Sequence, residues 1–302
     1  MKFGLFGACS GICAQPSVAR RLAVAAEKLG FDSLWTGEHV VVPDPREVPS
    51  PVDPDFPMLH PAVGLAFLAG VTSKIKLGTG IVLIAQRNPV VLAKEMASLD
   101  AVSEGRLIMG IGAGYLHQEF LALGAPFAER GPRTDEAIDV LRCLWNEAKP
   151  NFKGRFTRFH DIQAYPRPVQ TGGPPIVVGG TSDAALKRTV LKAQGWYGFA
   201  LNVEQTRDVL DRLRRMTTKL DRPKHLGPLE ISLTPGIRLD PASVDIAASA
   251  DRLAYIADGH AAVRFLDEQG APQRFRLDAD VATAGTRTRL APDGSRLLTA
   301  AD

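Results

Sequence analysis

Two side chains with acid–base chemistry stand next to each other in this sequence, Glu38 and His39. They directly follow residues 33–36, a short apolar run that predicts a buried strand. A histidine gains or loses a proton near neutral pH, and a carboxylate beside it can assist that exchange. We therefore expect both residues to be catalytic and to move a proton during a hydride-transfer or oxygenation step. The alternative is a structural histidine that is hydrogen-bonded to a loop carbonyl.

A second feature is a run of glycines at alternate positions, Gly110, Gly112 and Gly114, at the end of the apolar residues 107–112. Bare backbone at the end of a strand lets a ligand approach closely, so the run indicates a cofactor. The spacing is not the GxGxxG of dinucleotide-binding domains, and no acidic residue ends a strand about 20 residues later. Close packing between elements is the competing interpretation, which would explain one glycine but not three.

A third feature is the turn formed by Gly179, Gly180, Thr181 and Ser182, which ends an apolar run and opens a predicted helix. Free backbone N–H groups and hydroxyls at a helix N-terminus bind phosphate well. We therefore expect a phosphate-binding turn here. An ordinary glycine turn with Thr181 or Ser182 as the helix cap is the alternative.

These residues need a scaffold, and short apolar runs alternate with amphipathic segments throughout residues 1–245. The apolar runs predict strands at 2–7, 33–36, 75–84, 107–112, 175–179, 196–201 and 230–237. Caps and apolar stripes predict helices at 17–29, 89–104 and 135–145, from 182 onward, and at 203–216. This alternation is typical of an α/β fold with a parallel sheet. Seven such strands over about 240 residues favour a (β/α)8 TIM barrel over a doubly wound sheet.

Two connections, residues 40–60 and 149–174, are longer than a barrel needs, and we expect both to be loops over the active end. After residue 245 the pattern changes. Residues 246–302 alternate short strands with Asp-Gly turns, and they resemble a fragment of a propeller blade. Residues 252–256 are a candidate eighth strand, but no closing helix follows. We therefore predict a barrel domain at 1–245 and an atypical β-rich tail at 246–302 in place of the last helix.

Composition narrows the classes of function. The 302 residues are 45% apolar and 23% charged with a net charge of +3, which indicates neither nucleic acid nor a membrane surface as partner. No apolar run approaches the roughly 20 residues that span a bilayer. The sequence holds Cys9, Cys13 and Cys143, which indicate reduced thiols, and no second Cys/His pair follows at metal-ligand spacing. We expect a cytoplasmic protein without a metal site that acts on a small molecule.

Several long segments occur in a fixed order along residues 1–245. They are MKFGLFG, FDSLWTGEHVVVP, LGTGIVLIAQRNPVVLAKEMASLDAVSEGRL, GIGAGYLHQEF, RGPRTDEAIDVLRCLW and PPIVVGGTSDAALKR. In these segments the chain resembles the bacterial luciferase-like flavin or deazaflavin oxidoreductases, and within them the branch of probable deazaflavin (coenzyme F420) oxidoreductases. The resemblance implies a barrel that holds coenzyme F420 or FMN over the carboxyl ends of its strands.

The resemblance also implies roles for individual residues. The third strand would contain a non-proline cis peptide at Gly80–Ile81 that backs the flavin ring. Glu38 and His39 match the family's acidic-histidine pair, with His39 handling the proton near the ring. The residues that match the cofactor-tail loop are Gly112, Gly114, Tyr115 and Gln118, and those that match the phosphate turn are Gly179, Gly180 and Thr181.

The expected function is the transfer of a hydride between coenzyme F420 and a small organic substrate, and the resemblance favours a homodimer. An FMN-dependent monooxygenase is the first alternative. The reactive chemistry belongs to the cofactor ring, so the sequence does not decide between the two. A non-catalytic flavin-binding or degenerate fusion protein is the second alternative, because the closing helix is missing from the sequence.

Overall fold

The computed structural model describes residues 2–234 and, beyond them, the strand segments 252–257, 260–266, 272–276, 287–290 and 297–300. The chain divides into two compact units, Met1–Thr234 and Pro235–Asp302. The division falls before the boundary that the sequence predicts at residue 245. Every predicted site residue belongs to the first unit.

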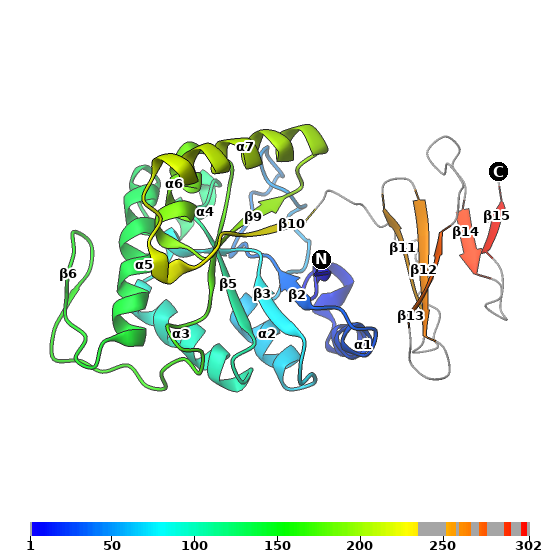
Figure 1. Ribbon diagram of the computed structural model, residues 1–302, viewed down its shortest axis with the longest axis horizontal. Helices are drawn as coiled ribbons and strands as arrows, with labels where there is room; N and C mark the ends of the chain where they lie inside the picture. Colours follow the sequence, from blue (N-terminus) through cyan, green and yellow to red (C-terminus); the bar gives the residue numbers. More distant parts are fainter. Residues whose placement is uncertain are drawn as a thin grey trace. The chain divides into compact units, whose positions relative to one another are not determined.

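The first unit is built around one parallel sheet (Figure 1). Its strands are β1 (Gly4–Phe6), β2 (Ser33–Thr36), β3 (Lys76–Thr79), β4 (Val82–Leu83), β5 (Leu107–Gly112), β8 (Ile176–Gly179), β9 (Gly195–Phe199) and β10 (Glu230–Thr234). The order is β1-β2-β3-β5-β8-β9-β10, with β4 also on β5. The sheet curls so far that Phe6 of β1 and Phe199 of β9 have ring centroids 4.9 Å apart. It is a nearly closed parallel barrel, and in the described residues β1 and β10 are the ends of its strand order.

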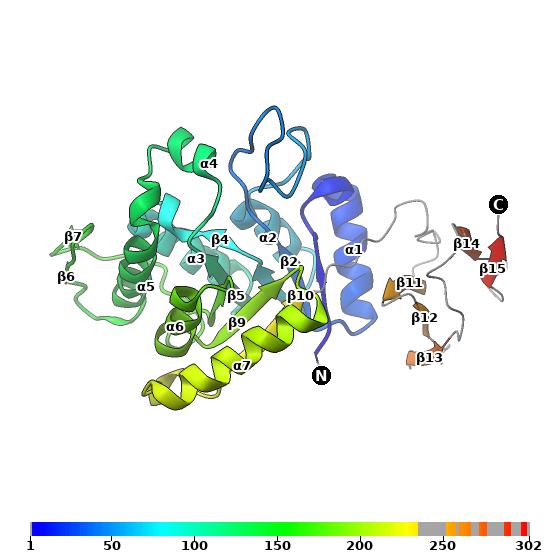
Figure 2. The same ribbon diagram turned by 90° about the horizontal axis from the view of Figure 1, so that it is seen from above.

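Helices cover the outside of this sheet (Figure 2). They are α1 (Pro16–Lys28), α2 (Pro61–Ala69), α3 (Pro89–Val102), α5 (Arg130–Asn146), α6 (Asp183–Lys192) and α7 (Val203–Lys219). The short helix α4 (His117–Ala122) follows β5 at the carboxyl end of the strands. The predicted cap of α3 is confirmed, because the Asn88 side chain accepts hydrogen bonds from the N–H groups of Val90 and Val91. Helix α2 was not predicted from the sequence. It is apolar all round, so it shows no stripe.

The prediction of a single strand at 75–84 is wrong in one respect, because the structure has two strands there, β3 and β4, with a break between them. β3 pairs with the first half of β5 and β4 with its second half. The break falls at the Gly80–Ile81 peptide, which is cis, as the resemblance implies. After β4 the chain turns into a short 3-10 helix, η2 (Ile84–Gln86).

The expectation that residues 149–174 cover the active end is wrong. Asp100 accepts hydrogen bonds from the N–H groups of Val169 and Gln170. The Gln170 side chain donates to the carbonyl of Leu107, the first residue of β5. This connection follows a helix rather than a strand, and it therefore lies at the amino ends of the strands.

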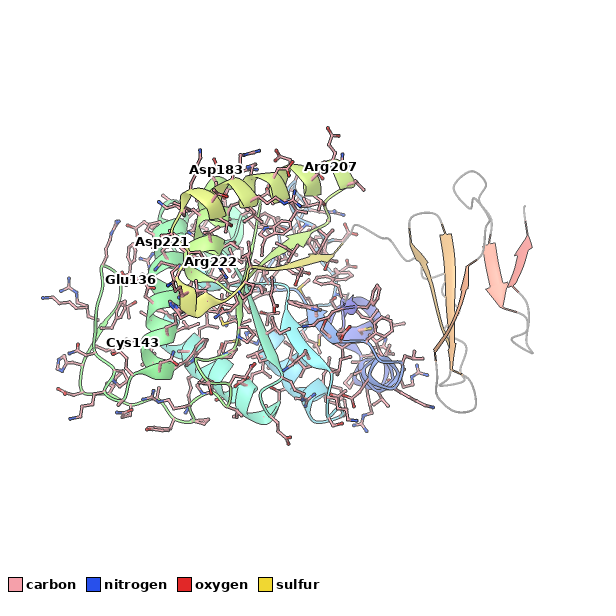
Figure 3. All side chains as sticks on the ribbon, viewed as in Figure 1. Glu136, Cys143, Asp183, Arg207, Asp221 and Arg222 are labelled. Atoms are coloured by element: carbon pink, nitrogen blue, oxygen red, sulfur yellow. The ribbon has the colours of Figure 1, made fainter. Side chains whose placement is uncertain are left out.

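Part of the same connection is a small hairpin formed by β6 (Phe152–Lys153) and β7 (Arg158–Phe159). Its turn is held by one carboxylate, Glu136 of α5 (Figure 3). The Glu136 side chain accepts hydrogen bonds from the backbone N–H groups of Arg155, Phe156 and Thr157. These hydrogen bonds fix the position of the hairpin on α5.

In the second unit, β11 (Arg252–Ala257), β12 (His260–Leu266) and β13 (Pro272–Arg276) form an antiparallel sheet, and β14 (Arg287–Leu290) pairs with β15 (Leu297–Ala300). The candidate eighth strand at 252–256 falls within β11. Its ladder is antiparallel to β12, so in the described residues it is not a strand of the parallel barrel. No helix in the described part of the chain is long and apolar enough to cross a membrane.

At the amino end of the barrel, Arg106 connects three segments. Its side chain is only 7% exposed and donates to the carbonyls of Ser103, Ile75, Ala69 and Thr72 at 2.7, 3.3, 2.9 and 3.1 Å. Lysine cannot reproduce this planar fork of donors. Each buried acceptor left without a donor costs about 1–3 kcal/mol.

We expect Arg106→Lys to lower the free energy of unfolding by about 2–4 kcal/mol, as measured by urea denaturation. The control is Arg214→Lys, at an exposed arginine of α7 paired with Asp211. Surface substitutions of that kind stay within about 0.5 kcal/mol of the parent. Equal urea midpoints for the two variants would contradict the assigned role of Arg106.

Candidate active site

The candidate active site lies where β2, β4 and β5 end. Glu38 and His39 follow β2, Gln86 ends the 3-10 helix after β4, and Glu119 lies in α4 after β5. The strands are parallel, so these segments meet at one end of the barrel. This is the end at which barrel enzymes carry their chemistry.

The carboxylate that contacts His39 is Glu119. Nδ1 of His39 lies 3.2 Å from Oε2 of Glu119. The same carboxylate accepts from the Val40 N–H at 2.6 Å and from the Gln86 side chain at 3.1 Å. Burial by itself would raise the pKa of Glu119, but the hydrogen bonds from His39, Gln86 and Val40 outweigh it and hold that pKa below its ordinary value. An ionised carboxylate therefore fixes the imidazole in place.

Tyr115 occupies the other side of the imidazole. Its hydroxyl lies 3.3 Å from Nε2 of His39, and the two rings meet edge to face with centroids 5.7 Å apart. Burial, and then the charge of Glu119, raises the pKa of the Tyr115 hydroxyl, so it stays protonated at neutral pH. Tyr115, His39 and Glu119 thus form one hydrogen-bonded chain that runs from the surface to a buried carboxylate.

Glu38 has a different set of partners. Its side chain is 1% exposed, accepts from the N–H of Leu83 at 2.7 Å and pairs with Arg87. Nε2 of His60 lies 3.9 Å from Glu38 and 2.7 Å from Arg87. Glu38 therefore ties the end of β2 to β4 rather than serving His39. The expectation that adjacent Glu38 and His39 form the acid–base pair is wrong in its geometry, and a catalytic role for Glu38 stays a prediction.

Gly80, Ile81, Gly112 and Gly179 come together in the structure. A Cβ on Gly112 would lie 1.9 Å from Cδ1 of Ile81, and one on Gly179 would lie 3.2 Å from its Cγ2. A Cβ on Gly80 would lie 2.8 Å from the hydroxyl of Tyr197. Side chains at these glycines would collide with the barrel interior. Their roles toward a cofactor stay predictions.

Gly114 and Gln118 have local roles in the loop after β5. Gly114 has φ +84°, and a Cβ there would lie 2.6 Å from the ring of Phe120. The Gln118 side chain donates to Glu47 at 2.7 Å. Gln118 therefore joins α4 to the 40–60 segment, which follows β2 and lies at the active end as predicted.

The turn at 179–182 opens α6. Gly180 has φ +105°, and its carbonyl accepts from the indole N–H of Trp196 at 2.9 Å. The Ser182 hydroxyl accepts from the N–H of Ala185 and caps the helix, while Thr181 is exposed. The first helical residue is Asp183 (Figure 3), and its carboxylate is paired with Arg212 of α7. The cap is confirmed, and phosphate binding by this turn stays a prediction.

The sequence analysis missed the residues that give the site its order: Glu119, Gln86, Arg87 and His60. Glu119 lies inside the glycine-rich segment that was singled out, but nothing local distinguishes it from the neighbouring Gln118. His60 lacks ligand spacing along the chain, and its partners Glu38 and Arg87 are distant in sequence. Within the described residues, no group of three or more His, Cys, Asp or Glu side chains is placed to hold a metal ion.

Comparison with known proteins places this barrel and site in a family. The family described as luciferase-like monooxygenase matches residues 7–296 of this chain. An uncharacterized protein of Mycobacterium tuberculosis is 31% identical over 204 residues, which are 65% of this chain and 71% of that protein. An F420-dependent glucose-6-phosphate dehydrogenase of Intrasporangium calvum is 32% identical over 225 residues, which are 66% of this chain and 64% of that enzyme.

Solved structures agree on the fold. The monooxygenase RslO1 from Streptomyces bottropensis is 28% identical, with a TM-score of 0.62 over 77% of this chain and 69% of that one. An F420-dependent secondary alcohol dehydrogenase is 22% identical, with a TM-score of 0.64 over 77% of this chain and 68% of that one. The fold is the luciferase-like version of the TIM barrel. The chain belongs to the luciferase-like monooxygenase family, whose members are F420- or FMN-dependent oxidoreductases and monooxygenases.

Proposed function

We propose that this protein is an oxidoreductase that transfers a hydride between coenzyme F420 and a small organic substrate. The observation that carries the proposal is the hydrogen-bonded chain from Tyr115 through His39 to the buried Glu119. Hydride chemistry at a carbon that bears a hydroxyl releases or takes up one proton. A fixed imidazole with a carboxylate behind it is suited to that exchange.

Two partly exposed aromatic side chains at the carboxyl end of the barrel would suit a flat, largely apolar ring. Phe6 and Phe199 are 37% and 46% exposed there, although they touch each other. Gly80 packs closely against Phe6 and Tyr197 at the same place. We propose that the Gly80–Ile81 peptide supports the ring from behind, and that the N-terminus of α6 with Thr181 and Ser182 receives the phosphate.

When bound, the deazaflavin supplies a carbon that accepts or gives a hydride. The protein's own residues then have separable tasks. Glu119 holds the imidazole of His39, and His39 stores the proton at Nε2. The segment after β2 is joined to α4 by the hydrogen bond between Glu47 and Gln118, which fixes its position beside the site.

The relatives support F420 over FMN. Curated relatives at 32% and 34% identity are F420-dependent glucose-6-phosphate dehydrogenases, although they match 66% and 55% of this chain. An FMN-dependent monooxygenase is the second candidate, because the RslO1 structure at 28% identity is named a monooxygenase.

The test offers the purified protein F420 or FMN and a panel of alcohols and sugar phosphates. We expect loss of the deazaflavin absorbance band with at least one alcohol, without oxygen consumption. Oxygen consumption with reduced FMN, and no change in F420, would overturn the proposal in favour of the monooxygenase. Tight binding of either cofactor without turnover of any donor would favour a non-catalytic protein.

A further inference from the structure

We propose that Tyr115 is the residue that exchanges the proton with the substrate, and that His39 and Glu119 act behind it as a relay. The inference rests on the proposed function and adds to it a further catalytic residue. It also names the substrate class, a molecule whose reacting carbon bears a hydroxyl. The family resemblance implies for Tyr115 only a place in the lining of the cofactor tail.

The solvent exposure of the three hydrogen-bonded side chains indicates which of them meets the substrate. Tyr115 is 47% exposed, whereas the His39 side chain is 10% exposed and the Glu119 side chain is fully buried. Nδ1 of His39 is occupied by Glu119, and Nε2 faces the Tyr115 hydroxyl. A molecule that approaches from solvent therefore reaches the phenol first.

The hydrogen bonds are compatible with one arrangement of the protons in which the relay works. The ionised Glu119 can only accept, so Nδ1 of His39 carries a proton and donates it. With one proton on the imidazole, at Nδ1, the Nε2 atom is an acceptor and the Tyr115 hydroxyl is its donor, and this is the arrangement that the proposal requires. The raised pKa of Tyr115 agrees with this, because the phenol must keep its proton to donate it. In this arrangement the hydrogen-bonded series of Tyr115, His39 and Glu119 can take up one proton at Tyr115.

The step balances for the oxidation of an alcohol. The carbon–hydrogen bond breaks, and its hydrogen leaves with both electrons as a hydride to the oxidised deazaflavin. The hydroxyl proton passes to Oη of Tyr115 while the Tyr115 proton passes to Nε2 of His39. The substrate becomes a carbonyl compound, and the imidazolium rests beside the Glu119 carboxylate until the proton returns to solvent. The reverse sequence reduces a carbonyl.

The decisive variant is Tyr115→Phe, which keeps the ring and its edge-to-face contact with His39 but removes the hydroxyl. We expect the rate of F420 reduction by an alcohol to fall about 100-fold, within the usual range for loss of a general acid–base. Affinity for F420 should change less than about twofold, because the ring remains. The matched control is Tyr165→Phe, an exposed tyrosine in the connection between α5 and β8, which should behave as wild type.

A second readout uses the protein without cofactor. In spectra of 15N-histidine-labelled protein, the Nε2 resonance of His39 should shift in Tyr115→Phe and stay in place in Tyr165→Phe. A Tyr115→Phe variant that reduces F420 at the wild-type rate would overturn the role of Tyr115 while leaving the proposed function standing. An unmoved Nε2 resonance would overturn the hydrogen bond itself. If none of the alcohols tested supports F420 reduction by the wild-type protein, the proposed function is overturned instead.

Discussion

A Glu119→Gln variant is expected to turn over at least about 100-fold more slowly than the wild type, which is the size of effect that loss of an oriented acid–base produces. The amide keeps the volume of the carboxylate but loses its charge. Its NH2 group can also face the Val40 N–H or Nδ1 of His39, where only an acceptor fits. The imidazole is then free to adopt the other tautomer, in which Nε2 no longer accepts a proton. The measurement is the rate of F420 reduction with the best alcohol of the panel.

The same variant should be less stable, and the loss should depend on pH. The pKa of Glu119 is held below its ordinary value, so the folded state favours the ionised form. The stability this contributes is present above the unfolded pKa of about 4.3 and is lost as the pH falls through the lower folded pKa. The difference in urea midpoint between wild type and Glu119→Gln should therefore be large at pH 7 and shrink in acid. A constant difference from pH 7 down to acid would contradict this account.

The control is Glu204→Gln, at an exposed position in the first turn of α7. It removes one carboxylate from the chain without touching the site, so its turnover should match the wild type and its stability should change by less than about 0.5 kcal/mol. Equal turnover rates for Glu119→Gln and Glu204→Gln would show that the buried Glu119 carboxylate has no role in the mechanism.

A Gly110→Ala variant is expected to lose about 3 kcal/mol or more of its free energy of unfolding, at the upper end of what overpacking costs. A Cβ at Gly110 would lie 1.9 Å from the carbonyl oxygen of Thr79 on the neighbouring strand. That oxygen is a backbone atom, and it cannot move aside easily because β3 is paired with β2 on one side and with β5 on the other. The strands must therefore separate to admit one methyl group. Chemical denaturation followed by circular dichroism measures the loss.

The control for this prediction is Gly70→Ala. Gly70 is exposed at the end of α2 with φ −73° and ψ −10°, a conformation open to any residue, and the nearest atoms to its Cβ lie at 3.6 Å. We expect its stability to stay within about 0.5 kcal/mol of the wild type. If Gly110→Ala unfolds at the same denaturant concentration as Gly70→Ala, the steric explanation of the glycine run is wrong.

The glycine run shows where sequence reasoning stops. Gly110 and Gly112 are at alternate positions of β5 and therefore lie on the same face of the sheet. Packing was expected to explain only one of the three glycines. Instead each has a steric cause of its own, in Thr79, in Ile81 and in Phe120. These causes lie on other segments, and no pattern within residues 107–114 could reveal them.

Local signals were otherwise reliable. The Asn88 and Ser182 caps place two helix starts correctly, because a cap is an interaction between near neighbours. The partner of His39 could not be found this way. Glu119 lies 80 positions further along the chain, and only the folding of α4 against the end of β2 brings the two together. Adjacency in sequence favoured Glu38, whose side chain turns to Arg87 instead.

The two oxygens of the Glu119 carboxylate have different kinds of hydrogen-bond partner, one a side chain and the other the main chain. Oε2 takes the imidazole of His39, and Oε1 takes the backbone N–H of Val40, where the 40–60 segment begins. That segment cannot swing outward from its root without withdrawing a hydrogen bond from the group that steadies the imidazole. Any outward movement of this segment at Val40 would therefore also disturb the alignment of the His39 imidazole.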